Sequence, residues 1–205
     1  EWVYYSILPA IKPETILVLN ADDPLVSCFA EENEGQRVAW FGLEEFSGST
    51  YEHRGVYDDG QRCPVCRAAL TYLYHHYHHI GHYMCPNCGH HRHMPDFMGT
   101  ALDLEAGKLT INYKHSIDLA FRSIYNVYNI LAAYAVCREC GVSSETIARV
   151  IDNYILKNGR VVRFTIGGYS GTLLVSKHEN SVAYDTNLRY VAALKEPCTV
   201  MVILD

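Results

Sequence analysis

Several features of nucleic-acid-binding and membrane proteins are missing from this sequence. Its 205 residues carry 17 Lys and Arg against 23 Asp and Glu, a formal net charge of −6 at pH 7, and Lys and Arg nowhere form a run. A phosphate backbone would attract such a chain only weakly, so we expect no nucleic-acid partner. No long apolar run occurs either, so we expect no membrane span.

A phosphate-binding loop is also missing from the 205 residues. No Gly-x-x-x-x-Gly-Lys-Ser/Thr motif occurs, and Gly107-Lys108-Leu109 lacks both the first Gly and the hydroxyl residue. Without that loop the sequence offers no cradle of backbone amides and Lys for the β- and γ-phosphates of a nucleotide. With 49% hydrophobic residues the chain can still bury a sizeable core, in one or two domains.

Cysteine, by contrast, is plentiful, and its spacing indicates a metal centre. Cys63-Pro-Val-Cys66 and Cys85-Pro-Asn-Cys88 are two Cys-x-x-Cys pairs separated by eighteen residues. This spacing lets four thiolates close a tetrahedron on one Zn²⁺ at about 2.3 Å per sulfur, and Gly89 permits the positive φ that such turns often need. We predict a zinc ribbon over about residues 61–95, with a structural site made by Cys63, Cys66, Cys85 and Cys88. Two disulfides, or four unrelated buried cysteines, are the alternatives.

A third Cys-x-x-Cys, formed by Cys137 and Cys140, has no partner pair and lies in a segment of high apolar content. We interpret both residues as packing residues and not as metal ligands or a redox pair. Eight cysteines, four of them at zinc spacing, favour a reducing, cytoplasmic environment.

The residues between the two cysteine pairs predict a β-hairpin. Leu70–Tyr74 and Gly81–Met84 have the aromatic and β-branched character of two short strands. Eight of the eleven histidines lie between His75 and His93. A second metal site is one hypothesis; we favour a solvated, pH-sensitive face, with His75-His76 and His78-His79 at the tip of the hairpin.

A cluster of polar residues follows a strand that we predict to be buried on both faces. Thr15–Leu19 is a continuous apolar run typical of a parallel sheet, and Asn20-Ala-Asp22-Asp23 comes directly after it. Polar side chains at the carboxyl end of such a strand lie where open α/β sheets bind ligands, and Pro24 can begin a helix. Arg37–Phe41 predicts a second strand and completes a β-α-β pattern. N-capping by Asp22 or Asp23 is the alternative.

Two amides lie on a long helix expected in the second half of the chain. After a strand at Leu109–Tyr113, apolar residues at helical spacing predict an amphipathic helix from near Asp118 to Gly141. Asn126 and Asn129 are three residues apart, so both amides project from nearly the same face. Paired donors and acceptors of this kind suit the edge of a purine ring.

A new α/β unit is expected after Asn158-Gly159. It follows a short helix that we expect from Ser143 or Ser144 to about Lys157. The expected elements of the new unit are a strand at 161–166, a turn at 167–171, a strand at 172–175, a helix at 182–194 and a strand at 199–204.

Three motifs and the ribbon, taken in order, resemble the Mur ligase family. The motifs are Leu19-Asn-Ala-Asp-Asp-Pro24, Tyr125-Asn-Val-Tyr-Asn-Ile-Leu-Ala-Ala133 and Asn158-Gly-Arg160, and the ribbon, with Gly81-His-Tyr83 before its second cysteine pair, stands between the first and the second. The combination is similar to the MurT-type branch, the ligase subunits of lipid II isoglutaminyl synthases. It implies a central parallel-sheet α/β domain at 1–157 with its N-terminal part missing, the inserted ribbon, and the beginning of a truncated C-terminal α/β domain at 158–205.

The resemblance also implies a reaction. MurT-type ligases use ATP and Mg²⁺ to phosphorylate the α-carboxylate of D-glutamate in the stem peptide of lipid II. Ammonia from a GatD-like glutaminase partner, held in a heterodimer, then displaces the phosphate and gives D-isoglutamine. This amidation belongs to peptidoglycan biosynthesis, in the bacterial cytoplasm at the inner face of the membrane. Because the phosphate loop is missing, we expect the chain to be part of a longer ligase and inactive alone.

Residue roles come from the same resemblance. Asn126 and Asn129 would contact the adenine, Arg160 would approach the phosphates or ribose, and Asn20, Asp22, Asp23 and Lys177 would be further cofactor-binding residues; no catalytic residue is assigned. The family pattern Gly-Arg-x-Glu has Val162 at its last position here, and Lys-Asn-Pro-Ala-Gly reads Lys177-His-Glu-Asn-Ser181, so only its Lys is carried over. The alternative function is a zinc-ribbon module that binds protein or nucleic acid without catalysis.

Overall fold

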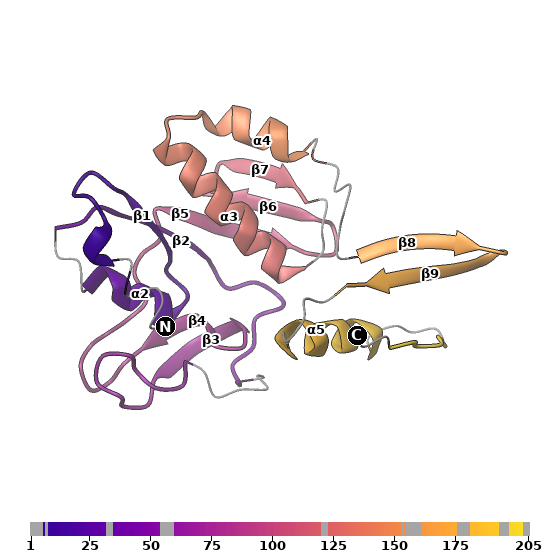
Figure 1. Ribbon diagram of the computed structural model, residues 1–205, viewed down its shortest axis with the longest axis horizontal. Helices are drawn as coiled ribbons and strands as arrows, with labels where there is room; N and C mark the ends of the chain where they lie inside the picture. Colours follow the sequence, from indigo (N-terminus) through magenta and orange to yellow (C-terminus); the bar gives the residue numbers. More distant parts are fainter. Residues whose placement is uncertain are drawn as a thin grey trace. The chain divides into compact units, whose positions relative to one another are not determined.

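The chain divides into two compact units, Glu1–Ile155 and Leu156–Asp205. The computed structural model describes residues 6, 8–31, 35–53, 60–119, 123–152, 154, 161–175, 181–192 and 197–202. Figure 1 labels the helices and strands of both units. No helix among these residues is long and apolar enough to cross a membrane.

A five-stranded sheet in the order β1-β2-β5-β6-β7 forms the centre of the first unit. Its strands are β1 (Leu17–Asn20), β2 (Val38–Leu43), β5 (Phe97–Asp103), β6 (Lys108–Ile111) and β7 (His115–Asp118). β1, β2 and β5 run parallel, with Leu19 opposite Trp40 and Leu43 opposite Gly99. β6 and β7 pair antiparallel at the other edge. The parallel core was expected from the sequence, and the antiparallel edge makes the sheet mixed.

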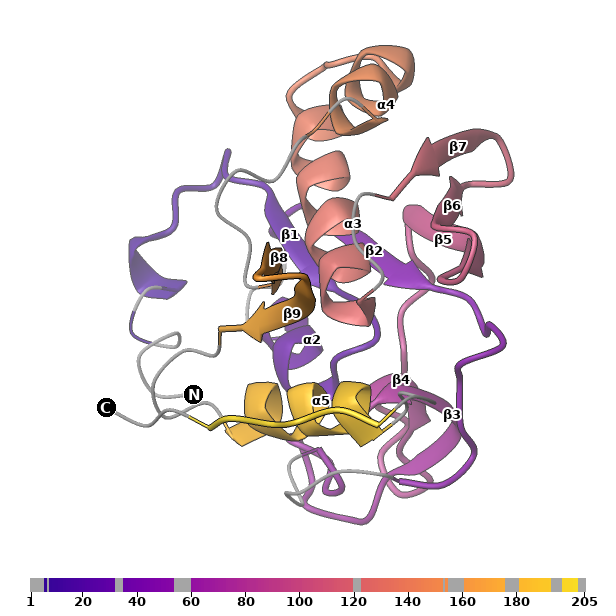
Figure 2. The same ribbon diagram turned by 90° about the vertical axis from the view of Figure 1, so that its right-hand side faces the viewer.

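Helices cover this sheet and connect its strands. After the 3₁₀ turn η1 (Leu8–Ala10) and β1, helix α2 (Pro24–Glu31) leads to β2. Helix α3 (Ile124–Glu139) packs against β1, β2 and β5, and α4 (Ser144–Asp152) packs against β7 and α3, as Figure 2 shows from the side. The inward side chains of α3, such as Leu131, join Leu109 and Ile117 of the sheet in one apolar core. Gly141, at φ +81°, follows the end of α3.

The sequence-based prediction misses strand β5 and assigns part of β7 to a helix. The prediction of a helix from near Asp118 is wrong, because that residue ends β7 and α3 begins only at Ile124. Ile117 pairs with Leu109 across β6 and β7 and is fully buried, whereas its neighbours Ser116 and Asp118 are exposed. This alternation is that of a strand, and the helical spacing of Ile117 relative to later apolar residues is coincidental.

The predicted ribbon forms the connection between the parallel strands β2 and β5. Its hairpin consists of β3 (Thr71–Tyr77) and β4 (Ile80–Met84), with Tyr72 opposite Tyr83. β3 extends three residues beyond the predicted Tyr74. Gly81 allows the two strands to approach, since a Cβ there would lie 2.2 Å from the Tyr74 carbonyl oxygen.

The second unit contains a two-stranded hairpin and a helix. β8 (Val161–Ile166) and β9 (Tyr169–Leu174) pair antiparallel through a two-residue turn, Gly167-Gly168, in which both φ angles are positive. Helix α5 (Ser181–Ala192) matches the helix expected at 182–194. The strand expected at 199–204 is not formed over the described residues 199–202, which pair with no other described strand.

Candidate metal centre and nucleotide site

The four cysteines of the ribbon converge on one point. Their sulfur atoms all lie within 4.8 Å of one another; Cys63 Sγ is 3.6 Å from Cys88 Sγ, and Cys66 Sγ is 3.5 Å from Cys85 Sγ. A tetrahedron with metal–sulfur distances of about 2.3 Å has edges of about 3.8 Å, so the arrangement fits one Zn²⁺. It is too wide for the S–S bonds of about 2.05 Å that the disulfide alternative requires.

The two cysteine turns share one backbone design. Arg67 N–H donates to the Cys63 carbonyl at 2.9 Å, and Gly89 N–H donates to the Cys85 carbonyl at 3.1 Å. Both residues that follow the second cysteine of a pair have positive φ, 66° at Arg67 and 80° at Gly89. The amide groups therefore curl around each pair of sulfurs and bring both thiols to the same side. Glycine relieves the strain of this conformation in the second turn only.

The third cysteine pair lies away from this cluster. Cys137 is half-buried on α3, next to the apolar core, and Cys140 is exposed at the end of the helix. Among the described residues, Cys63, Cys66, Cys85 and Cys88 form the group that could hold a metal ion. The arrangement agrees with our interpretation of Cys137 as a packing residue, whereas the same interpretation is wrong for Cys140, because its side chain is exposed.

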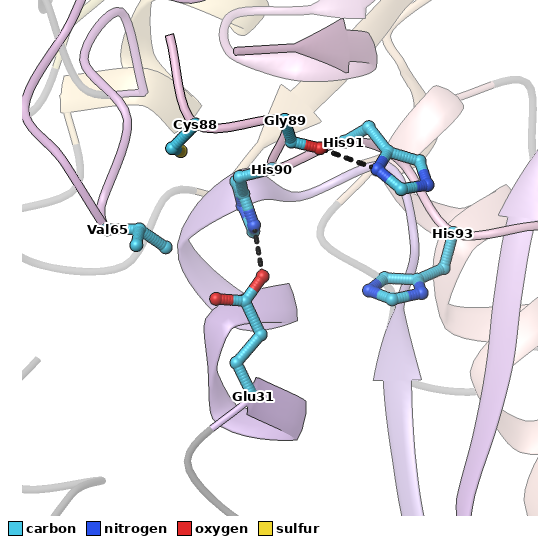
Figure 3. Close-up of a pocket in the computed structure, with 7 residues that line it drawn as sticks. All are labelled: Glu31, Val65, Cys88, Gly89, His90, His91 and His93. Atoms are coloured by element: carbon cyan, nitrogen blue, oxygen red, sulfur yellow. Dashed lines mark hydrogen bonds and ion pairs between the residues drawn. The ribbon is translucent and has the colours of Figure 1, made fainter.

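The second cysteine turn is docked onto helix α2. The Tyr83 hydroxyl donates to Ser27 Oγ at 2.5 Å, and His90 Nδ1 lies 2.6 Å from Glu31 Oε1. Figure 3 shows this contact at the wall of a cavity of about 180 Å³, lined by Glu31, Val65, Cys88, Gly89, His90, His91 and His93. Since the His90 and Tyr83 side chains are buried, this face of the ribbon is an internal interface.

A buried carboxylate connects the ribbon, the sheet and α3. Asp22 is fully buried, and its Oδ1 accepts from Arg92 Nε at 2.5 Å. Its Oδ2 accepts from the Leu43 amide at 2.7 Å and from the Tyr128 hydroxyl at 2.6 Å. Its carbonyl accepts from the Gly81 amide of β4 at 2.9 Å. One residue at the end of β1 thus holds β2, the hairpin and the helix together.

The buried Asp22 carboxylate shifts the pKa of its neighbours and fills a space that Gly42 leaves open. Burial alone would lower the pKa of Arg92, but the Asp22 carboxylate raises it overall. Burial, with the charge and hydrogen bond of Asp22, raises the pKa of Tyr128 well above its ordinary value. A Cβ at Gly42 would come within 2.8 Å of Asp22 Oδ1, so Gly42 leaves the space that the carboxylate occupies.

The expectation of a solvated histidine face is wrong. His75 and His76 are buried, and His78 and His79 are half-buried. His76 Nε2 lies 3.0 Å from the Leu43 carbonyl and its Nδ1 lies 3.1 Å from Ser49 Oγ, so the neutral ring donates to the first and accepts from the second. Burial lowers the pKa of His76. The hairpin thus places the His76 ring against the carboxyl end of β2 and not in solvent.

The predicted nucleotide-binding residues lie at or just after the end of β1, on α3 and in segments outside the described residues. Asp23 caps α2 by accepting from the Leu25 amide at 2.9 Å, and Asn20 Oδ1 accepts from the Asp22 amide at 3.1 Å. The capping alternative is therefore the role seen for Asp23, while nucleotide contacts of Asn20, Asp22 and Asp23 stay predictions. On α3, Asn126 is half-buried and Asn129 is exposed. Arg160 and Lys177 lie outside the described residues.

Sequence reasoning missed Arg92 and Tyr128, and it placed His76 in solvent and not in this buried region. The absence of any acidic residue between Gln61 and Pro95 was the available signal for Arg92, because a buried Arg in such a segment must find its carboxylate elsewhere. Tyr128 lies within the motif that contains Asn126 and Asn129. Nothing in the sequence indicates that Arg92 or Tyr128 contacts Asp22, because both are distant from it along the chain.

Comparisons with known proteins agree with the motifs. No family model matches the chain. It is 35% identical over 153 residues to the lipid II isoglutaminyl synthase (glutamine-hydrolyzing) subunit MurT of Staphylococcus aureus strain COL, a match that covers 72% of this chain and 33% of that protein. It is 29% identical over 211 residues to the MurT subunit of Streptococcus pneumoniae strain R6, covering 98% of this chain and 45% of that protein. The chain thus spans between a third and just under half of the length of these curated relatives.

A solved structure supports the same relationship at the level of the fold. A pseudomurein peptide ligase type C from Methanothermus fervidus matches 72% of this chain and 29% of its own, with a TM-score of 0.58 and 26% sequence identity. Together with the MurT matches it confirms the resemblance inferred from the motifs: the chain is similar to MurT subunits at 29 to 35% identity, and its fold is similar to that of a pseudomurein peptide ligase.

Proposed function

We propose that this chain is part of an ATP-dependent amide ligase of peptidoglycan synthesis, which converts the D-glutamate α-carboxylate of the lipid II stem peptide to D-isoglutamine with ammonia from a GatD-like glutaminase. The match to MurT subunits over 72 to 98% of the chain carries this proposal. Its place of action is the bacterial cytoplasm. The alternative of an independent zinc-ribbon binding module is disfavoured by the docking of the ribbon through Tyr83 and Arg92 onto the rest of the first unit.

The cysteine cluster supplies a structural metal in this proposal. Four thiolates leave no open coordination position, so Zn²⁺ held by Cys63, Cys66, Cys85 and Cys88 would stabilise the ribbon and take no part in the reaction. The reaction would use Mg²⁺ and ATP, whose adenine we assign to the face of α3 that carries Asn126 and Asn129. Arg160, Asn20, Asp22, Asp23 and Lys177 are the further nucleotide-binding candidates.

Nucleotide binding to the chain is the first experiment. Because the 205 residues contain no phosphate loop, Mg-ATP should bind with a dissociation constant no better than about 1 mM, a binding free energy of about 4 kcal/mol. NMR titration can follow the side-chain amide signals of Asn126 and Asn129. Asn112 lies on the β6–β7 turn and its side-chain amide donates to the Asp96 carbonyl, so its signal serves as an internal control.

We expect the Asn126 and Asn129 signals to shift with saturation while the Asn112 signal stays in place. Replacement of either residue by Ala should cost roughly 1 to 3 kcal/mol of affinity, since each removes a hydrogen bond to the base. Shifts confined to other residues would contradict the adenine assignment. Glutamine-dependent amidation of lipid II by the full-length ligase that contains this chain, together with its glutaminase, tests the reaction itself.

A further inference from the structure

We propose that Arg92, Asp22 and Tyr128 are positioning residues that couple the cysteine-held ribbon to helix α3, so that the metal state of the ribbon sets the order of the helix that carries Asn126 and Asn129. The inference about the helix stands on contacts within the first unit. Its consequence for nucleotide binding rests on the function proposed above.

The first link joins the cysteine cluster to Arg92. Arg92 follows Cys88 by four residues, and its amide donates to the Tyr83 carbonyl at 3.0 Å. Between them, His91 forms a β-bridge with Met84, the residue before Cys85. The backbone of Arg92 is therefore fixed by the same turn that presents Cys85 and Cys88. If the metal dissociates, the four cysteines no longer hold the turn together, and the backbone of Arg92 is no longer fixed in position.

The second link is the buried ion pair. The Asp22 side chain is 0% exposed and that of Arg92 is 6% exposed, so neither charge is compensated by water. When Arg92 withdraws, the Asp22 carboxylate keeps only the Leu43 amide and the Tyr128 hydroxyl as its described partners. A buried carboxylate in this state either takes up a proton or moves toward water. Both outcomes alter its hydrogen bond to Tyr128.

The third link brings the change to α3. Tyr128 is buried on the inner side of the helix, between the two turns that carry Asn126 and Asn129. Its ring also meets the ribbon directly, with centroids 5.6 Å from Tyr77 and 6.2 Å from His76. The first half of α3 therefore contacts the ribbon in addition to the sheet. We expect the order of this half of the helix to depend on the ribbon being in place.

The second half of α3 has a separate support and provides a matched control. Tyr134 is buried on the same helix, and its hydroxyl donates to Ser144 Oγ of α4 at 2.8 Å. Neither Tyr134 nor Ser144 contacts the ribbon through a described hydrogen bond. Tyr128→Phe and Tyr134→Phe thus delete equivalent hydroxyls from one helix, but only the first breaks the proposed connection.

Amide hydrogen exchange of the Zn²⁺-loaded chain and of the chain after chelation tests the coupling without any nucleotide. We expect chelation to speed exchange in β3, in β4 and in the first half of α3, about tenfold or more, with a much smaller change in the second half. Faster exchange in the ribbon alone, with α3 unchanged, would overturn the proposal. A uniform rise over the whole first unit would signal global unfolding, and the variants below then decide.

The variants keep the metal bound, which metal analysis verifies in each. Arg92→Ala should reproduce the faster exchange in the first half of α3. Tyr128→Phe should do the same, and it should remove the additional effect of Arg92→Ala in the double variant, whereas the effects of Arg92→Ala and Tyr134→Phe should simply add. If Tyr128→Phe and Tyr134→Phe changed the exchange rates of α3 equally, the contacts of Arg92, Asp22 and Tyr128 would only hold the ribbon in place, and the proposal would fail.

Nucleotide titration separates this inference from the proposed function. If the exchange results hold and Mg-ATP also binds less tightly to Tyr128→Phe than to Tyr134→Phe, both stand. If the exchange results hold while Asn126→Ala and Asn129→Ala leave nucleotide binding unchanged, the adenine assignment fails and the coupling of ribbon and helix remains.

Discussion

The two β-hairpins of the chain differ in what surrounds their side chains. In β3–β4, Ile80, Tyr83 and His76 are buried against the sheet and helices of the first unit. In β8–β9, Ile166 is 71% exposed and Tyr169 is 83% exposed. Both hairpins pair antiparallel. The register is continuous between Val161–Ile166 and Tyr169–Leu174, whereas the pairing of Thr71–Tyr77 with Ile80–Met84 shifts between Tyr72 and Tyr74 and again between His75 and Tyr77.

This difference shows that strand pairing is a small part of what fixes β3–β4. An isolated two-stranded hairpin is at best marginally stable in water. β3–β4 gains a cysteine cluster at its base, a buried ion pair and an apolar contact with the core, whereas β8–β9 has a Gly-Gly turn that matches the twist of its strands. Each support of β3–β4 can be removed separately, and the expected losses differ widely.

The largest effect is expected from the metal. We predict one Zn²⁺ per chain, and its removal should abolish protection from exchange in β3–β4, because structural zinc sites supply on the order of 10 kcal/mol of folding free energy. Metal analysis of Cys63→Ser should show the loss of the ion. Cys137→Ser is the control, and it should retain the full metal content. An equal zinc content in both variants would refute the assignment of the ligands.

The next largest effect is expected from the ion pair. Arg92→Ala leaves the Asp22 carboxylate buried without its charge partner, which should destabilise the first unit by about 3 to 5 kcal/mol. Arg37→Ala is the matched control, since Arg37 pairs with Glu139 at 2.5 Å but is itself 66% exposed. Such a surface pair contributes about 0 to 1 kcal/mol. Denaturant unfolding of the two variants measures the difference, and similar midpoints would argue against a buried, essential pair.

The sequence predicts those parts of the fold that depend on residues close together in the chain, and it fails where contacts between distant residues decide the structure. Local signals predicted the cysteine turns and the β-α-β start correctly, because a few adjacent residues decide each of them. They also located the turn at Gly167-Gly168, but the expected turn at 167–171 is too long, because β9 already begins at Tyr169. The strand β7 was mistaken for the beginning of a helix, because Ile117 satisfies both a helical spacing with later residues and the alternation of a strand. Its pairing with Leu109 decides between them, and that pairing is a tertiary contact.

The candidate site shows the same limit more clearly. The four cysteines could be assigned as a group from spacing alone. The histidines could not be assigned as buried, because their polarity and clustering suggest solvent, and only the docking of the hairpin onto Leu43 and Ser49 brings His76 inside. The contact of Asp22 with Arg92 and Tyr128 joins positions that are 70 and 106 residues apart. A single sequence carries no signal for such pairs.

A moderate effect is expected from acid. Burial lowers the pKa of His76 from its ordinary value of 6.5, so the unfolded chain takes up the proton first as the pH falls. The stabilising contribution of the neutral ring is therefore complete above pH 6.5 and is lost as the pH falls below it, until the folded protein is protonated too. We expect His76→Gln, which keeps a donor for the Leu43 carbonyl, to reduce the loss of stability between pH 7.5 and 5.5 by on the order of 1 kcal/mol. His115→Gln on β7 is the control, and an identical pH profile for wild type and His76→Gln would contradict the prediction.

The smallest effect is expected in the second hairpin and completes the comparison. Ile166→Ala removes a side chain that is 71% exposed, so it creates no cavity and should change stability by no more than about 0.5 kcal/mol. Ile80→Ala, the same substitution at a residue that is 4% exposed in the core, should cost about 2 to 5 kcal/mol. Hydrogen exchange followed separately in β3–β4 and β8–β9 reports on each hairpin without assuming that the two units unfold together. A large loss of protection in β8–β9 on Ile166→Ala would mean that this side chain is covered in solution, and the contrast between a supported and an exposed hairpin would not hold.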